Sequence, residues 1–267
     1  SWRMLIDYEL LPNDVFFNNS VSGASVHDLI AIYQLYNNNN KLPQKLILSI
    51  EPWIFNEKSG QIRWQSLSKA YNQFHGNSQA YSKTTKFFEL FSFSYFQSSL
   101  KHLPEKLKGQ DTPQPTDVRF NASNTKLSDG SFVFSKRKRT ASESSIDAQV
   151  KSFIAKGIYC GDDFDEISQS LWQDLQDLTQ AIKQNQIELE FLFVPYHPKA
   201  YQEVQANYPL VLETERMART FAQNQGIKTM GSYDPANNSL TKDDFYDGMH
   251  PRESAMAKLL KKSAFNE

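Results

Sequence analysis

The chain has few residues that could form disulfide bonds or bind metal ions. Its 267 residues include one cysteine, Cys160, and five histidines. A single cysteine excludes an intramolecular disulfide, so the fold must depend on its core, and reducing and oxidising compartments suit the chain equally. No two histidines have the His-x-His or His-x-x-x-His spacing of common metal sites. We therefore expect no metal ion and no other cofactor.

Two further absences concern membranes and nucleic acids. No stretch approaches the roughly eighteen consecutive apolar residues of a membrane-spanning helix, and no charged and apolar leader opens the chain. The formal net charge of -1 provides no global field that would attract nucleic acid or anionic lipid. The one cluster of like charge is Lys-Arg-Lys-Arg at residues 136–139. We interpret it as a solvated face or mobile loop, with an anionic glycan or lipid headgroup as the alternative contact.

What the sequence does contain is an alternation of apolar patterns typical of an α/β fold. Residues 15–21 predict a short strand, and residues 26–36 carry apolar side chains at helical spacing behind Ser25 as a cap. The mostly apolar run at residues 45–50 is typical of a strand buried on both faces of a parallel sheet. Strand, helix and strand in this order predict a right-handed βαβ unit.

The same alternation returns in the C-terminal third. Strands are predicted at residues 187–194 and 227–230, with a helix at about 211–224 between them and a last helix after Pro251. A further helix precedes the first of these strands, because five apolar residues follow a 3.6-residue period: Ile167, Leu171, Leu175, Leu178 and Ile182. The two ends of the chain therefore look like halves of one doubly wound sheet.

The segment between these halves, about residues 57–160, loses the alternation. It carries a predicted helix at 83–103, followed by several prolines, and Asp129-Gly130 then predicts a hairpin turn before an apolar run at 132–134. We interpret the segment as a helical and hairpin insertion within a single domain spanning residues 1–267. The predicted fold class is α/β, a three-layer α/β/α sandwich around a central, mostly parallel sheet.

The strongest chemical signal is Asp247-Gly248-Met249-His250, placed after the last strand and before the final helix. In a doubly wound sheet this is a loop at the C-terminal edge, where ligands bind. A tight loop can bring the Asp247 carboxylate to one ring nitrogen of His250 and leave the other nitrogen to act as a general base. The alternative is that Asp247 caps a turn and His250 only begins a helix.

A second segment, Asn18-Asn19-Ser20-Val21-Ser22-Gly23, resembles the second conserved block of the SGNH (GDSL-like) hydrolases, whose glycine amide helps form the oxyanion hole. Together with Asp-x-x-His-Pro near the end, it reproduces the arrangement of that superfamily. Residues 48–56, 194–198 and 231–235 also resemble extracytoplasmic SGNH-like proteins of surface-polysaccharide and teichoic-acid acylation systems. The resemblance covers both halves of the sheet, about 160 residues, and does not cover the insertion.

The resemblance implies a catalytic triad and an oxyanion hole. It identifies Ser1 as the nucleophile, because that serine stands 22 residues before Gly23, with Asp247 and His250 completing the triad. The chain opens on Ser1 without a methionine, as if cut from a longer polypeptide, so the alternative is that Ser1 is a remnant without a role. Ser22 is the second candidate nucleophile.

Other candidate residues surround this expected site. The Gly-x-Asn-Asp block of the superfamily is missing, and residues 51–56 occupy its place, so Asn56 is the candidate second oxyanion donor or else a turn residue. Glu51 is a candidate for capping or for binding substrate. Trp53, with Phe55 and Trp64, is expected to form a carbohydrate-stacking wall or part of the core.

One candidate comes from the far half of the sheet. His197 follows the strand at 187–194 and is a candidate to bind a polar substrate, or a histidine held by a turn carbonyl.

The resemblance implies a function as well, that of a serine esterase or O-acyltransferase acting on an acylated cell-envelope polysaccharide or another acyl ester. The resemblance also implies an extracytoplasmic location, an upstream anchor and a membrane acyltransferase partner. The alternative function is a non-catalytic polysaccharide-binding or assembly protein on the same scaffold.

Overall fold

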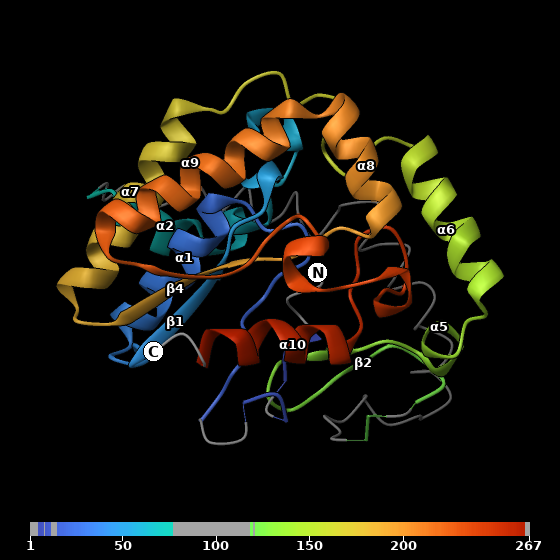
Figure 1. The fold of residues 1–267 in the computed structure, drawn as a ribbon. Helices are drawn as coiled ribbons and strands as arrows, with labels where there is room; N and C mark the ends of the chain where they lie inside the picture. The colour runs from blue at the N-terminus through green and yellow to red at the C-terminus, as the bar shows by residue number, and fades with distance from the viewer. Residues whose placement is uncertain (1–4, 8, 12–14, 77–117, 120, 265–267) are drawn as a thin grey trace, which may run out of the picture.

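The computed structural model describes residues 5–7, 9–11, 15–76, 118, 119 and 121–264 (Figure 1). Within these ranges the chain forms an α/β fold with one three-stranded parallel sheet and one two-stranded antiparallel hairpin. The helices and strands are α1 Val26–Asn38, β1 Lys45–Ser49, α2 Ser68–Phe74, β2 Thr125–Lys126, β3 Phe132–Val133, α5 Lys136–Arg139, α6 Glu143–Ala155, α7 Gln169–Gln184, β4 Glu188–Phe193, α8 Pro198–Asn207, α9 Pro209–Gln225, β5 Lys228–Gly231 and α10 Glu253–Ala264. Short 3₁₀ turns occupy Pro52–Phe55, Glu57–Ser59, Arg63–Leu67, Ala236–Asn238 and Lys242–Asp244.

The parallel sheet joins the two ends of the described chain. Its strand order is β1-β4-β5, so Leu48 of β1 lies opposite Phe191 of β4, which in turn lies opposite Thr229 of β5. Every residue of β4 after Glu188 is buried, as expected for the central strand of a parallel sheet. The prediction that the N-terminal and C-terminal parts contribute to one parallel sheet is confirmed.

The predicted helices that pack on this sheet are also confirmed, with shifts of a few residues at their ends. Helix α7 contacts β4, while α9 and α10 both contact β5. In Figure 1, α9 runs above the strands and α10 below them. The apolar stripe of α7 is buried as its period predicts, with exposed fractions between 0% and 5% for Leu171, Leu175, Leu178 and Ile182.

Helix α1 starts where the sequence predicts. The Ser25 hydroxyl accepts a hydrogen bond from the Asp28 amide at 3.2 Å, and the Asp28 carboxylate accepts one from the Ser25 amide at 2.7 Å. This reciprocal capping box satisfies two amides that the helix itself leaves without partners. The chain is thereby fixed immediately after Gly23.

The strand predicted at residues 15–21 is wrong, because this segment has no regular secondary structure. The Asn18 side chain folds back and accepts a hydrogen bond from the Ser20 amide at 2.9 Å. The Asn18 amide donates to the Asp129 carbonyl at 2.7 Å, and its side-chain amide donates to the Ile6 carbonyl. Local bonds of this kind compete with a strand ladder, so the predicted βαβ unit lacks its first strand.

The insertion is described only in part, and the helix predicted at 83–103 lies outside the described residues. The predicted hairpin is confirmed, with β2 and β3 antiparallel and a turn closed by the Gly130 amide on the Leu127 carbonyl at 3.1 Å. Gly130 has φ +79°, a conformation that favours glycine. The basic run forms the short helix α5. Within the described ranges, no helix combines the length and hydropathy that crossing a bilayer requires.

Candidate functional site

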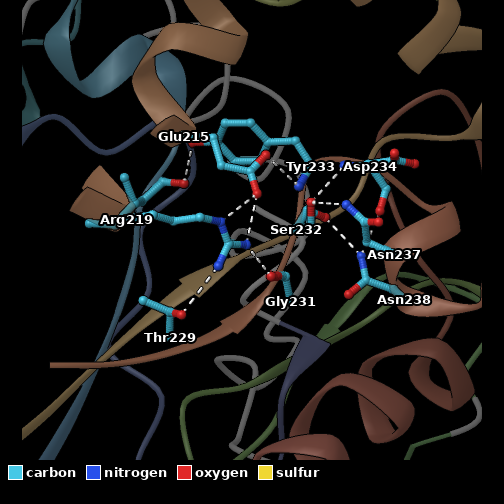
Figure 2. A network of polar contacts seen from close by, with 10 residues as sticks. Glu215, Arg219, Thr229, Gly231, Ser232, Tyr233, Asp234, Asn237 and Asn238 are labelled. Atoms are coloured by element: carbon cyan, nitrogen blue, oxygen red, sulfur yellow. Dashed lines mark hydrogen bonds and ion pairs between the residues drawn. The ribbon is translucent and has the colours of Figure 1, made fainter. Parts of the chain in front are cut away.

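The loop between β5 and α10 carries the candidate site, and its first part is fixed by the polar network of Figure 2. Glu215 of α9 accepts hydrogen bonds from the Tyr233 amide at 3.0 Å and from two nitrogens of Arg219 at 2.9 and 2.7 Å. The same guanidinium donates to the Gly231 carbonyl and lies 4.4 Å from the ring centroid of Phe193. Helix α9 thus holds the end of β5 in place.

The following residues of the loop are held by backbone contacts. Asn238, which is 3% exposed, donates to the carbonyls of Ser232 and Asp234 at 2.9 Å each. The Tyr233 hydroxyl donates to the Ile50 carbonyl at 2.7 Å, at the end of β1. These bonds tie the loop after β5 to the same edge of the sheet at which β1 ends.

Asp247 and His250 form the centre of the candidate site. Nδ1 of His250 lies 2.8 and 2.9 Å from the two carboxylate oxygens of Asp247, and the two side chains are 15% and 14% exposed. Oδ1 of Asp247 also accepts the amides of Met249 and His250 at 3.0 Å each. The carboxylate therefore both closes the turn and contacts the imidazole, whereas His250 does not begin a helix, because α10 starts at Glu253.

A side chain at the centre of this turn would clash with Phe153. A Cβ atom on Gly248 would lie 2.4 Å from Cδ1 of Phe153 in α6. The turn is closed further by the Tyr246 amide, which donates to the His250 carbonyl at 2.8 Å. The sequence order Asp-Gly-Met-His thus lets the loop pack tightly under α6 while the carboxylate and imidazole meet.

Two side chains of the insertion complete the surroundings of this pair. Nζ of Lys138 lies 2.5 Å from Oδ2 of Asp247 and 4.1 Å from the ring centroid of Phe134. The Phe134 ring in turn packs edge-on to His250 at 5.5 Å between centroids. The interpretation of the basic run as a solvated face or mobile loop is therefore wrong for Lys138, which is 23% exposed at its side chain.

The electrostatics of the pair favour an ionised carboxylate and a neutral imidazole. Burial alone would raise the pKa of Asp247, but the hydrogen bond and charge of His250 and the charge of Lys138 bring it well below its usual value. Burial lowers the pKa of His250, Asp247 opposes this change, and Lys138 adds to it, so that the pKa is lower than usual. With its proton on Nδ1 towards Asp247, a neutral imidazole carries its lone pair on Nε2. That nitrogen is the basic one.

His197 lies beside this loop, at the start of α8. Its amide donates to the Gly248 carbonyl at 3.1 Å, and its Nδ1 accepts the Lys199 amide at 3.1 Å. Burial and the charge of Lys199 lower the pKa of His197. Since a neutral ring that accepts at Nδ1 carries its proton on Nε2, His197 is a hydrogen-bond donor. A small cavity beside it is lined by apolar side chains, among them Ile146, and by charged ones, among them Asp147, Asp243 and Arg252.

A second group of predicted residues gathers at the turn before α1. Gly23 has φ +59°, and a Cβ there would lie 2.8 Å from the Tyr159 hydroxyl. Nε1 of Trp53 donates to the Ala24 carbonyl at 3.2 Å. Trp53 is 1% exposed and packs edge-on to Tyr159, which favours a core role over a stacking wall. The side chain of Ser22 is exposed.

The residues after β1 have partners of their own. The Asn56 amide donates to the Cys160 carbonyl at 3.2 Å, while its oxygen accepts the Lys58 amide at 2.9 Å. Glu51 is fully buried, and its carboxylate accepts the Ser49 hydroxyl at 2.7 Å. Asn56 thus serves as a turn and capping residue. A role for its amide in an oxyanion hole stays a prediction that requires this bond to open.

Sequence reasoning missed Lys138 and Phe134, and the first candidate nucleophile lies beyond the described part. Ser1 lies outside the described residues, so its place relative to His250 stays a prediction. The aromatic run before the basic cluster was a usable signal for Phe134, but no local pattern distinguishes Lys138 from its three basic neighbours. In the described part of the chain, no group of three or more His, Cys, Asp or Glu side chains is placed to hold a metal ion.

The chain was also compared with known proteins. Neither protein-family models, nor characterised proteins, nor solved structures give a significant match.

Proposed function

We propose that the protein is an SGNH-type serine esterase or O-acyltransferase in which Asp247 and His250 activate Ser1. The observation that carries the proposal is the Nδ1 contact of His250 with both oxygens of Asp247, at 2.8 and 2.9 Å in a largely buried loop. A carboxylate that holds Nδ1 leaves Nε2 to take a proton from a hydroxyl, which is the geometry of an acyl-transfer triad. The lowered pKa of His250 keeps this base neutral near pH 7.

The proposed reaction has two steps. In the first, Nε2 of His250 takes the Ser1 proton as the hydroxyl oxygen attacks the ester carbonyl, and the amide of Gly23 stabilises the oxyanion together with that of Ser1. The leaving alcohol receives the proton from His250, and an acyl-serine ester remains. In the second step His250 takes a proton from water or from a sugar hydroxyl, whose oxygen attacks this ester. The bond to the Ser1 oxygen then breaks, and His250 returns the proton to that oxygen. Water gives an esterase, whereas a sugar gives an O-acyltransferase.

The fold supports this proposal through the position of the loop. The three parallel strands in the order β1-β4-β5 place the loop after β5 at the carboxyl edge, where open α/β sheets bind ligands. We infer that the whole domain is a three-layer α/β/α sandwich. The contacts of both α9 and α10 with β5, and their positions above and below the strands in Figure 1, support that inference.

The surroundings of the pair support a polar acceptor. The cavity beside His197 combines carboxylates from Asp147 and Asp243 with the guanidinium of Arg252. Sugar hydroxyl groups can donate hydrogen bonds to these carboxylates and accept hydrogen bonds from the Arg252 guanidinium and from His197, so the cavity suits a sugar. We infer a polysaccharide of the cell envelope as the substrate. The resemblance to SGNH-like proteins of acylation systems further supports the proposal of an extracytoplasmic location and of a membrane acyltransferase as the source of the acyl group.

The second candidate function is polysaccharide binding without catalysis. The bond between the Asn56 amide and the Cys160 carbonyl favours it, because that amide is then not directed at an oxyanion. An oxyanion hole that lacks one donor loses about 3 kcal/mol of transition-state stabilisation. The cavity beside His197 would serve either function.

Hydrolysis of p-nitrophenyl acetate and release of acetate from an O-acetylated xylan test the proposal. We expect the full-length protein to turn over both esters, and His250→Gln to lower kcat/KM at least 1000-fold while His75→Gln, at the end of α2, leaves it unchanged. Equal rates of ester hydrolysis for the wild-type protein and His250→Gln would refute the proposal that the protein is an esterase using His250. Xylan binding retained by both in the absence of turnover would support the second candidate.

A further inference from the structure

The insertion contributes a cation to the candidate site. Lys138 of α5 places its Nζ 2.5 Å from Oδ2 of Asp247, and Lys136 of the same run is exposed. The ammonium also lies over the face of Phe134, whose ring edge-packs on His250. A cation held between a carboxylate and an aromatic face is partly desolvated, so its charge acts on its neighbours more strongly than a solvated one.

Two side chains, His250 and Lys138, share the carboxylate of Asp247. Oδ1 of Asp247 already accepts two backbone amides, and Nδ1 of His250 lies within 2.9 Å of both oxygens. When His250 takes up a proton, its imidazolium must share Asp247 with the ammonium of Lys138. Two cations around one anion repel each other, which disfavours the charged imidazole.

The other charged groups around the pair have different contacts. Arg139 donates to the Phe134 carbonyl at 2.7 Å, and the Arg252 guanidinium lies 4.7 Å from the ring centroid of Tyr246. The Tyr246 hydroxyl donates to the carboxylate of Glu253. These contacts fix the walls of the site, whereas Lys138 contacts the carboxylate that orients the imidazole.

We propose that Lys138 is a positioning residue that binds Asp247 and keeps His250 in its neutral, proton-accepting form. The inference rests on the proposed function for its catalytic meaning, because a neutral His250 matters only if it acts as a base. The effect of the Lys138 charge on the protonation of His250 can be measured whether or not the protein turns over a substrate. It also assigns a role to the insertion, which covers the pair with Phe134 and supplies the compensating cation.

The test is the titration of His250 by NMR in protein carrying ¹³C-labelled histidine, with the resonance assigned from its loss in His250→Gln. Replacing Lys138 by Met or by Gln removes the charge, and we expect the pKa of His250 to rise by roughly one unit in each variant. Lys138→Arg retains the charge and should stay within a few tenths of wild type. The matched control is Lys136→Met, which removes a charge from the same run and should leave the titration unchanged.

Esterase activity provides a second measurement. If the protein is an esterase, the acid limb of its kcat/KM profile should move to higher pH by the same amount in Lys138→Met as the NMR titration does. A titration that moves in a protein without turnover supports the role of Lys138 and refutes the proposed function. A titration that stays at the wild-type value in both Lys138→Met and Lys138→Gln overturns the role of Lys138, whatever the activity.

Discussion

Replacing Glu215 by Gln should destabilise the protein far more than the same change two residues earlier. Glu215 and Glu213 both lie in α9 and both pair with an arginine, but their environments differ. The Glu215–Arg219 pair has side chains 12% and 35% exposed, whereas the Glu213–Arg216 pair has side chains 37% and 67% exposed. In the first pair, Glu215 accepts the Tyr233 amide and Arg219 donates to the Gly231 carbonyl, both at the end of β5 (Figure 2). The second pair is at the surface.

The expected magnitudes follow from these contacts. Glu215→Gln removes the charge that pairs with Arg219 and sets an amide against a guanidinium, which should cost roughly 2–4 kcal/mol because the arginine is left partly buried. An exposed pair contributes about 0–1 kcal/mol, so Glu213→Gln should change stability little. With a urea m-value of about 3 kcal/mol per molar, the Glu215 variant should unfold at about 1 M lower urea.

Urea unfolding followed by circular dichroism at pH 7 provides the assay. Both variants should give the m-value of the wild type, so that midpoints can be compared directly. Equal midpoints for Glu215→Gln and Glu213→Gln would refute the reasoning, since the difference in burial would then have no energetic consequence. A loss below 1 kcal/mol for Glu215→Gln would refute it as well.

Two further predictions concern stability. Gly231 has φ +69°, and a Cβ there would lie 2.2 Å from the Phe193 carbonyl oxygen, so Gly231→Ala should lower the free energy of unfolding by roughly 2–4 kcal/mol. Gly226 has φ +66° but open space around it, so Gly226→Ala should lower it by only about 1 kcal/mol in the same urea assay. The pKa of His250 is lowered in the folded state, so below the unfolded value of about 6.5 the unfolded chain binds more protons and stability should fall as the pH falls. Urea midpoints between pH 7.5 and 5.5 should show this slope. The pKa of His197 is lowered as well and adds a slope of the same sign, so His250→Gln should reduce the slope, and an unchanged slope in that variant would contradict the prediction.

The sequence predicted the elements whose stability is local or whose pattern is long. The apolar stripe from Leu171 to Ile182 determines α7, and the capping box at Ser25 determines the start of α1. The approach of Asp247 to His250 was also predictable, because both belong to one four-residue turn with a central glycine. In each case the decisive interactions lie within a few residues of one another.

The remainder depends on partners distant in sequence. Residues 15–21 have a strand-like pattern, but Asn18 satisfies its polar groups with Ile6, Ser20 and Asp129 in place of a ladder. Lys138 meets Asp247 across 109 residues, and no local pattern encodes that contact. A basic residue in a run of four is usually solvated, so only the packing of the insertion reveals which one is not.

Labelling with a serine-directed fluorophosphonate, mapped by mass spectrometry of the tryptic peptides, tests the central claim most directly. The reagent forms a stable bond only with a serine whose proton a neighbouring base removes. The proposed triad predicts one adduct, on Ser1, that disappears in Ser1→Ala and falls at least 100-fold in His250→Gln and Asp247→Asn. An adduct on another serine, or labelling that is unchanged in His250→Gln, would contradict the account.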